Sequence, residues 1–472
     1  MMTTTTHRLT AVLILAALCF FKSSTVGAND DHHQDQPLPQ QPQQQPLVND
    51  DNCVAYLYED GTVNLLSSDD PRGPIVYGYD AQNLPKHRYP DPNTECIFKD
   101  GDALLHLSCA EERMMILRGP VQDHRDYRAT YLYHRRTINP RSDGDDVVVE
   151  RGLGIHGEDP AETKLQSATR PRCTREVEPI FIDVSKGDLS QGQRYQTGYF
   201  VTPVDFLRVM EFKLAANGNL VATATLTPAA SLTNEIKPAQ TPRYGWGLAH
   251  HAAASGKLLD YESVYSLDNQ REVFEGQWPE LEDIEERINE EQKLVRTQLI
   301  SDEDFYYHNE KTASYFYENT VPVWKSVAEG NWARVGRIMR EIAAQTDSEF
   351  ELGATSYGAY RQPGRRGQGR LELADTEELG GGYLRVPVPW VLQRYMVDKR
   401  NPRRGIVFHV INNPFLTPEE VREYMAERPR CRMVECHMAH REFAYVEQGF
   451  TYCCAIDDDD TLKEHKIENE SS

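Results

Sequence analysis

Short apolar segments that alternate with polar residues recur along much of the chain, separated by turn-forming residues. Such segments predict β-strands with one buried face. The clearest covers residues 219–226 and follows Asn217-Gly218, a pair typical of a tight hairpin turn. Further strands are predicted at 54–58, 104–109, 127–133, 180–184 and 199–201. The pattern therefore predicts a mainly β chain.

A helical period appears between Tyr261 and Thr312. Its apolar residues fall on one side of a helix, and acidic residues crowd the remaining positions. The apolar positions are Leu281, Ile284, Ile288, Val295 and Leu299. This spacing predicts an amphipathic helix at the surface.

The N-terminus predicts export from the cell. His7 and Arg8 precede an apolar run from Leu9 to Phe21, and small residues lead to Ala28, which is typical of a signal peptide over residues 1–28. The run is too short to cross about 30 Å of hydrocarbon, so no membrane partner is expected. Residues 29–51 are rich in His, Gln and Pro and predict a disordered leader.

Cysteine usage agrees with secretion, because loss of Cys19 with the signal peptide leaves an even set in two groups of four. The groups are Cys53, Cys96, Cys109 and Cys173, then Cys431, Cys436, Cys453 and Cys454. Disulfides within each group are expected, with the connectivity open. A zinc site at Cys431, Cys436 and His437 is the alternative, but a second pair of ligands is missing.

The formal net charge of −22 is unfavourable for contact with a polyanion. Two segments nevertheless concentrate arginine and lysine: a Gly-rich loop with Arg365 and Arg366, and residues 399–404. Each is either a phosphate-contacting surface or a solvated loop. Residues 457–472 begin with four aspartates and predict a solvated acidic tail rather than a Ca²⁺ site.

The most specific motif lies between Thr312 and Arg340 and contains Asn319-Thr-Val-Pro-Val-Trp324 and Gly330-Asn-Trp332. This segment resembles the secreted DNA/RNA non-specific endonucleases, in particular their arthropod branch. Further matches are Val386-Pro-Val-Pro-Trp390, the strand and turn at 406–414, and the cysteine motif at 449–454.

The resemblance implies an α+β fold in which a ββα metal finger lies on a mainly antiparallel sheet. The endonuclease-like domain would cover residues 166–456, after a β-rich N-terminal module over residues 52–165. Residues 262–311 would be an acidic helical insertion into that domain.

Members of this family hold one Mg²⁺ or Mn²⁺ on the scissile phosphate and use a His to deprotonate the attacking water. The His lies in an Arg-Gly-His-Leu motif. Asp-Phe follows six residues later, and Asn-x-x-Pro follows about 20 residues later. When His251 is aligned with the family His, Ala249 stands at the Arg position and Lys257 at the Asp position. His251 is then 319 − 251 = 68 residues from Asn319. His250 fits no better.

The family's metal ligand is an Asn nine residues after the first Asn of Asn-x-x-Pro, and here that position is Ala328. Alanine has no ligand atom, so Glu329 or Asn331 would have to take its place, and a shift of about 1 Å can reduce the rate about a hundredfold. Gly336 replaces a family Glu that orders the metal's water, whereas Arg340 matches a family Arg that contacts phosphate.

These positions imply a pseudonuclease that serves as an extracellular binding or structural protein, with no cofactor and an unidentified protein partner. The first alternative is an active endonuclease with His251 as general base and Mg²⁺ or Mn²⁺ as cofactor. The second is nucleic-acid binding without cleavage, through Asn319, Arg340, Arg365 and Arg366. Whether the chain is an enzyme, and its oligomeric state, stay open.

Overall fold

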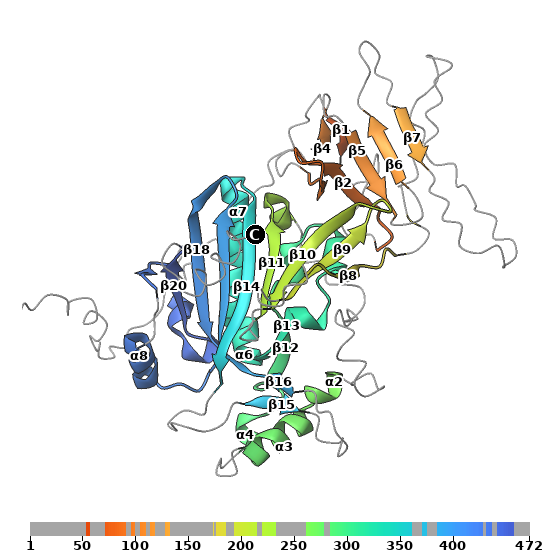
Figure 1. Cartoon of the computed structure of the whole chain (residues 1–472). Coiled ribbons are helices and arrows are strands. Elements are labelled where there is room, and N and C mark those ends of the chain that lie inside the picture. The colour runs from red at the N-terminus through yellow and green to blue at the C-terminus, as the bar shows by residue number, and fades with distance from the viewer. Residues whose placement is uncertain are drawn as a thin grey trace, which may run out of the picture. The chain divides into compact units, whose positions relative to one another are not determined.

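A nine-stranded antiparallel sheet forms the centre of the described structure (Figure 1). The computed structural model describes residues 53–56, 71–90, 96–99, 104–109, 114–118, 128–132, 173, 176–185, 193–214, 220–232, 261–277, 284–360, 371–374, 385–427, 431–436 and 441–456. All of them belong to one compact unit, Val48–Ser472. The predicted signal peptide, leader and acidic tail lie outside them.

The strand order in this sheet is β19-β20-β18-β17-β14-β11-β10-β9-β8. The strands are β8 (Ile180–Asp183), β9 (Gln193–Phe200), β10 (Phe206–Leu214), β11 (Leu220–Leu226), β14 (Phe350–Ala359), β17 (Pro389–Asp398), β18 (Asn401–Ile411), β19 (Met433–Val434) and β20 (Thr451–Ala455). The predicted hairpin is confirmed, because β10 and β11 pair antiparallel from Leu214 opposite Leu220 to Met210 opposite Ala224. With the helices described next, the fold is α+β, as predicted.

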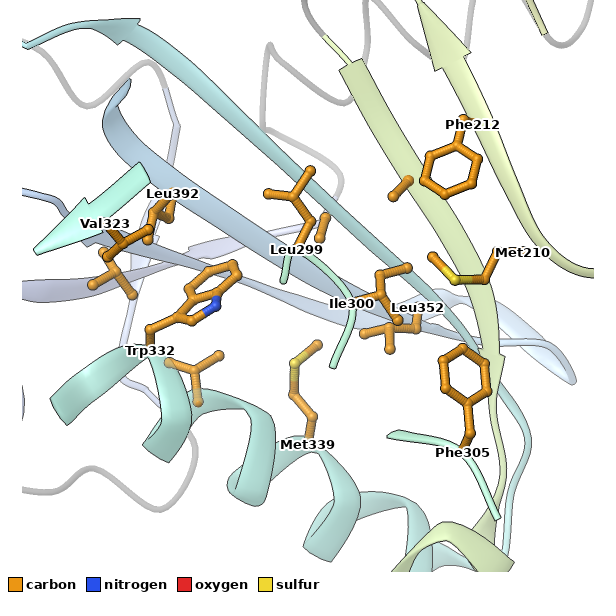
Figure 2. Close-up of a cluster of buried hydrophobic side chains, with 14 of the residues drawn as sticks. Met210, Phe212, Leu299, Ile300, Phe305, Val323, Trp332, Met339, Leu352 and Leu392 are labelled. Carbon is orange, nitrogen blue, oxygen red and sulfur yellow. The ribbon is translucent and has the colours of Figure 1, made fainter. Parts of the chain in front are cut away.

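A long amphipathic helix, α7 (Ala333–Thr346), packs against the sheet. Its buried residues recur every three or four positions and include Val335, Ile338, Met339 and Ala343, which is typical of a helix with one face in the core. Figure 2 shows Trp332 and Met339 directed toward Leu352 and Leu392 of the sheet, with Leu299 and Ile300 between the two layers. The core therefore lies between α7 and the sheet.

The other helices are short. They are α2 (Tyr261–Val264), α3 (Leu267–Gln277), α4 (Ile284–Arg287), α5 (His308–Thr312), α6 (Lys325–Val327) and α8 (Pro418–Glu427). No helix of the described ranges is both long and apolar enough to cross a membrane.

The amphipathic helix predicted from Leu281 to Leu299 is wrong. After α4 the chain forms a strand, β12 (Leu294–Gln298), which pairs antiparallel with β13 (Thr320–Trp324). The Gln270 side chain supports this turn into a strand, since it accepts a hydrogen bond from Leu294 N (2.8 Å) and donates one to Leu294 O (2.9 Å). Of the five apolar positions that suggested a helix, Leu299 enters the core from the loop after β12. Val295 lies on β12 and is half-buried, and its neighbour Leu294 enters the core from that strand.

The N-terminal part forms separate sheets, with a five-stranded sheet of order β3-β2-β5-β6-β7 and a pair β1-β4. The strands are β1 (Cys53–Tyr56), β2 (Ile75–Tyr79), β3 (Pro85–His87), β4 (Cys96–Lys99), β5 (Leu104–Ser108), β6 (Met114–Arg118) and β7 (Arg128–Leu132). A further small pair joins β15 (Glu372–Ala374) and β16 (Arg385–Pro387). The module boundary near residue 165 stays a prediction, because it falls outside the described ranges.

Disulfides pair within the two predicted groups. Cys109 is bonded to Cys173, Cys431 to Cys454, and Cys436 to Cys453. Both cysteines of the alternative zinc site are therefore used in disulfides, and His437 lies outside the described residues. Cys53 and Cys96 lie on the paired strands β1 and β4.

A buried polar cluster joins β3 to α5. The Glu310 carboxylate accepts hydrogen bonds from Tyr89 Oη (2.5 Å) and from Tyr307 N (3.0 Å), and it lies 3.9 Å from His87 Nε2. The Tyr89 and Tyr307 rings stack with their centroids 5.8 Å apart. Because both the His and the Glu are nearly excluded from water, the charge state of His87 affects this junction.

We expect this junction to make the protein sensitive to acid. Burial lowers the pKa of His87, and the Glu310 carboxylate opposes that effect only in part. The unfolded chain therefore takes up a proton near pH 6.5, before the folded chain does, and the stability falls as the pH drops below that value. In urea unfolding between pH 7.5 and 5, His87→Phe should reduce this loss of stability. An unchanged pH dependence in the variant would contradict the assignment.

Candidate functional site

A ββα unit lies at the edge of the core and contains the family motif. Strand β12 pairs with β13 from Leu294 opposite Trp324 to Gln298 opposite Thr320, and α6 follows β13 directly. A kinked turn (η5, Ala328–Trp332), in which the torsion angles of Gly330 are not helical, then leads into α7. The order strand, strand, helix is the one that a ββα finger requires.

The predicted general bases do not fall within this unit as described. His250 and His251 lie outside the described residues, as do Arg365 and Arg366. Strand β12 itself repeats the family spacing, with Arg296, Gln298 and Leu299 followed by Asp304-Phe305 six residues after Gln298. The distance to Asn319 is 319 − 298 = 21 residues, against 68 for His251. Sequence reasoning missed Gln298, although this spacing was a signal that could have found it.

The Gln298 side chain holds the loop that follows β12. Its Nε2 donates to Ser314 Oγ (3.0 Å) and Ser314 O (3.3 Å), and its Oε1 accepts from Asp302 N (3.1 Å). Its backbone carbonyl accepts a hydrogen bond from Trp332 Nε1 (3.1 Å), which ties β12 to η5. An amide is not a base at neutral pH, so Gln298 cannot take a proton from water.

The metal position offers no ligand group from its own side chain. Ala328 begins η5 and is half-buried, and the neighbouring Glu329 is exposed. Asn331 is fully buried and bonded: its Nδ2 donates to Glu442 O (2.9 Å) and Gly449 O (2.6 Å), and its Oδ1 accepts from Arg334. These bonds hold the C-terminal segment against η5.

Among the described residues, the group of His, Cys, Asp and Glu whose ligand atoms come within 4.8 Å of one another is His409, Cys431 and Cys454. Two of its members form a disulfide, and it contains no residue of the ββα unit. Divalent cations such as Mg²⁺ require several oxygen ligands, most often including a carboxylate. At the motif position itself, Ala328 has no ligand atom, and both polar side-chain atoms of Asn331 are bonded within the protein.

Asn319 acts as a clamp within this unit. Its Nδ2 donates to Ile300 O (2.8 Å) and Ser314 O (3.0 Å), and its Oδ1 accepts from Ile300 N (3.1 Å). The side chain is completely buried. These contacts hold the loop after β12 from the start of β13, and Gln298 holds the same loop from the end of β12.

Arg340, the predicted phosphate contact, is paired with carboxylates of the same loop. Its Nη1 donates to Asp304 Oδ1 (2.8 Å) and its Nη2 to Glu303 Oε2 (2.6 Å). Burial alone would lower the pKa of Arg340, but the two carboxylates outweigh it and raise that pKa. Asp304 also accepts a hydrogen bond from Arg394 Nη2 (2.9 Å), and both of these residues are almost fully buried.

No protein-family model matches the chain. It is 26% identical over 195 residues to salivary protein Tsal1 of Glossina morsitans morsitans, covering 41% of this chain and 45% of that protein. Over 180 residues it is 26% identical to a salivary endonuclease of Lutzomyia longipalpis, covering 37% of this chain and 39% of that protein. The chain thus matches less than half the length of these relatives.

A chain in the crystal structure of the EndoG/EndoGI complex aligns with 43% of this chain and 74% of its own length, at 9% identity and a TM-score of 0.24. A similarity this low does not assign a fold. The sequence similarity to the salivary proteins is the informative comparison: it supports the predicted resemblance to secreted endonucleases, because one of these two relatives is a salivary endonuclease.

Proposed function

We propose that this chain is a secreted pseudonuclease, with the scaffold of an endonuclease and without its chemistry. The observation that supports this most directly is the ββα unit, in which Gln298 and Ala328 stand at the family spacing for the general base and the metal ligand. Neither side chain can perform the corresponding step. The protein would therefore act through binding or structure, and it would need no metal.

The retained residues of the motif fit a scaffold. Leu299, Phe305 and Trp332 are buried in the core, and Asn319 clamps the loop between them. These structural side chains match the family motif, whereas Gln298 and Ala328 stand at the two reactive positions. Export would follow from the predicted signal peptide, and the disulfides fit an oxidising environment.

The experiment is a nicking assay with the purified mature protein. Supercoiled plasmid and RNA are incubated with Mg²⁺, Mn²⁺ or EDTA, and His251→Ala serves as the matched control. We expect no cleavage that EDTA abolishes, from either protein. Metal-dependent cleavage by the wild-type protein would overturn the proposal, and its loss in His251→Ala would identify His251 as the base of an active enzyme with relocated ligands.

A second candidate is nucleic-acid binding without cleavage, which the arginines retained in the motif favour. Arg296 lies with its guanidinium carbon 5.5 Å from the centroid of the Tyr317 ring, and Arg340 lies on α7. The ion pairs of Arg340 with Glu303 and Asp304 argue against a free phosphate contact there. Binding of this kind would weaken steeply as the salt concentration rises, whereas binding to a protein partner through apolar contacts would not.

A further inference from the structure

A buried guanidinium group from the central sheet packs against the ββα unit. Arg394 reaches from β17 into the core beneath α7, and its side chain is 2% exposed. Its Nε donates to Leu299 O (3.0 Å), its Nη2 donates to Asp304 Oδ2 (2.9 Å), and its guanidinium carbon lies 4.8 Å from the centroid of the Trp332 ring. It thus contacts the residue after Gln298 and the end of η5 at the same time.

Gly336 leaves the space that this guanidinium fills. A Cβ atom at position 336 would lie 2.5 Å from Arg394 Nη1 and 3.4 Å from Arg340 Nη1. The backbone of this helical residue needs no glycine, because its torsion angles are not in the left-handed region. The close approach of Arg394 is therefore the physical reason for a glycine here, at the position where the family has a Glu near its metal.

The charges around this position already balance. Arg394 and Arg340 carry two positive charges, and Asp304 and Glu303 carry two negative charges. Burial lowers the pKa of Arg394, but the Asp304 carboxylate opposes this, and a guanidinium remains charged at neutral pH. A divalent cation placed among these side chains would face a neighbouring positive charge that cannot be removed by deprotonation.

We infer that the Arg394 guanidinium excludes a divalent cation from this unit. It occupies the space of the family's metal-associated carboxylate. It would therefore prevent a divalent cation from binding even after the lost groups are restored. This inference rests on the proposed function, because it explains how the unit stays folded and metal-free. Arg394 is a positioning residue, because its guanidinium contacts Leu299, Trp332 and Asp304 at once.

The first test measures Mn²⁺ binding by isothermal titration calorimetry in a variant with the family's base and metal ligand restored, Gln298→His with Ala328→Asn. We expect this variant to bind Mn²⁺ more weakly, by about tenfold or more, than the same variant carrying Arg394→Met. Arg403→Met is the matched control, because Arg403 is exposed on β18, and it should change nothing. Equal Mn²⁺ affinity with Arg394 and with Met at this position would overturn the inference.

The second test needs no metal and keeps Arg394. Alanine is favoured over glycine within helices, so Gly276→Ala in α3, where an added Cβ meets nothing within 4 Å, should raise the Tm. Gly336→Ala should lower the Tm, because Arg394 must move. A rise in the Tm for both variants would contradict the assigned contact. Metal-dependent cleavage by the wild-type protein would instead refute the proposed function, so the two failures are distinguishable.

Discussion

Asp304→Asn is expected to destabilise the protein by about 3–5 kcal/mol, the range for breaking a buried ion pair by removing one partner. Asp304 is the shared partner of Arg394 and Arg340, and its side chain is 1% exposed. Without its negative charge, the Arg394 guanidinium stays in the core with no carboxylate bonded to it. Urea unfolding followed by circular dichroism at pH 7 measures the change.

Glu303→Gln is the matched control for this prediction. Glu303 pairs with the same arginine, Arg340, but its side chain is 68% exposed. Water and salt screen such a pair, so the expected loss is about 0–1 kcal/mol. Equal losses for Asp304→Asn and Glu303→Gln would show that the buried cluster does not hold the ββα unit together.

Asn319→Ala is expected to destabilise the protein by about 3 kcal/mol or more. The substitution leaves Ile300 N and Ile300 O without their side-chain partner in the core, and Ser314 O keeps only its longer bond from Gln298 Nε2 (3.3 Å). Each buried polar group left unsatisfied costs about 1–3 kcal/mol. Urea unfolding measures the loss. The same residue was a candidate for nucleic-acid contact, and a solvent-facing contact residue would tolerate this change.

The control for Asn319 is Asn289→Ala in the turn before β12. Asn289 also makes side-chain hydrogen bonds, to Glu286 O, Glu291 N and Gln292 N, but these bonds are exposed or half-buried. Water replaces them after substitution, so the expected loss is smaller than for Asn319. A neutral Asn319→Ala variant would remove the structural role assigned to that residue and reopen its candidacy for ligand contact.

Strands β8 and β11 and the end of β9 were predictable, because each is a short run of strand-forming residues between turn-forming residues. In β11 alanine and threonine alternate in the sequence from Ala222 to Thr225, although burial does not follow this period: Val221, Ala222 and Leu226 are buried. The segment from Leu281 to Leu299, by contrast, was wrongly predicted as one amphipathic helix. Its apolar residues enter the core from α4, from β12 and from a loop, and their spacing imitates one helical face.

Gln298 could not be found by searching for histidine. Its amide carries none of the chemistry that such a search looks for, and the pair His250-His251 offered that chemistry at a longer spacing from Asn319. The pairing of β12 with β13 makes Gln298 recognisable, since it shows which strand precedes the Asn319 motif in space. Arg394 was equally hidden, because it lies 90 residues after its partner Asp304.

Soaking crystals of the mature protein with Mn²⁺ is the direct test of the proposal that the ββα unit has no functional metal site. Anomalous difference maps locate bound Mn²⁺ independently of activity. We expect no Mn²⁺ peak beside Ala328 and an ordered Arg394 guanidinium on Asp304. A Mn²⁺ peak coordinated by Glu329, Asn331 or His251 would contradict the proposal and identify an active site with relocated ligands.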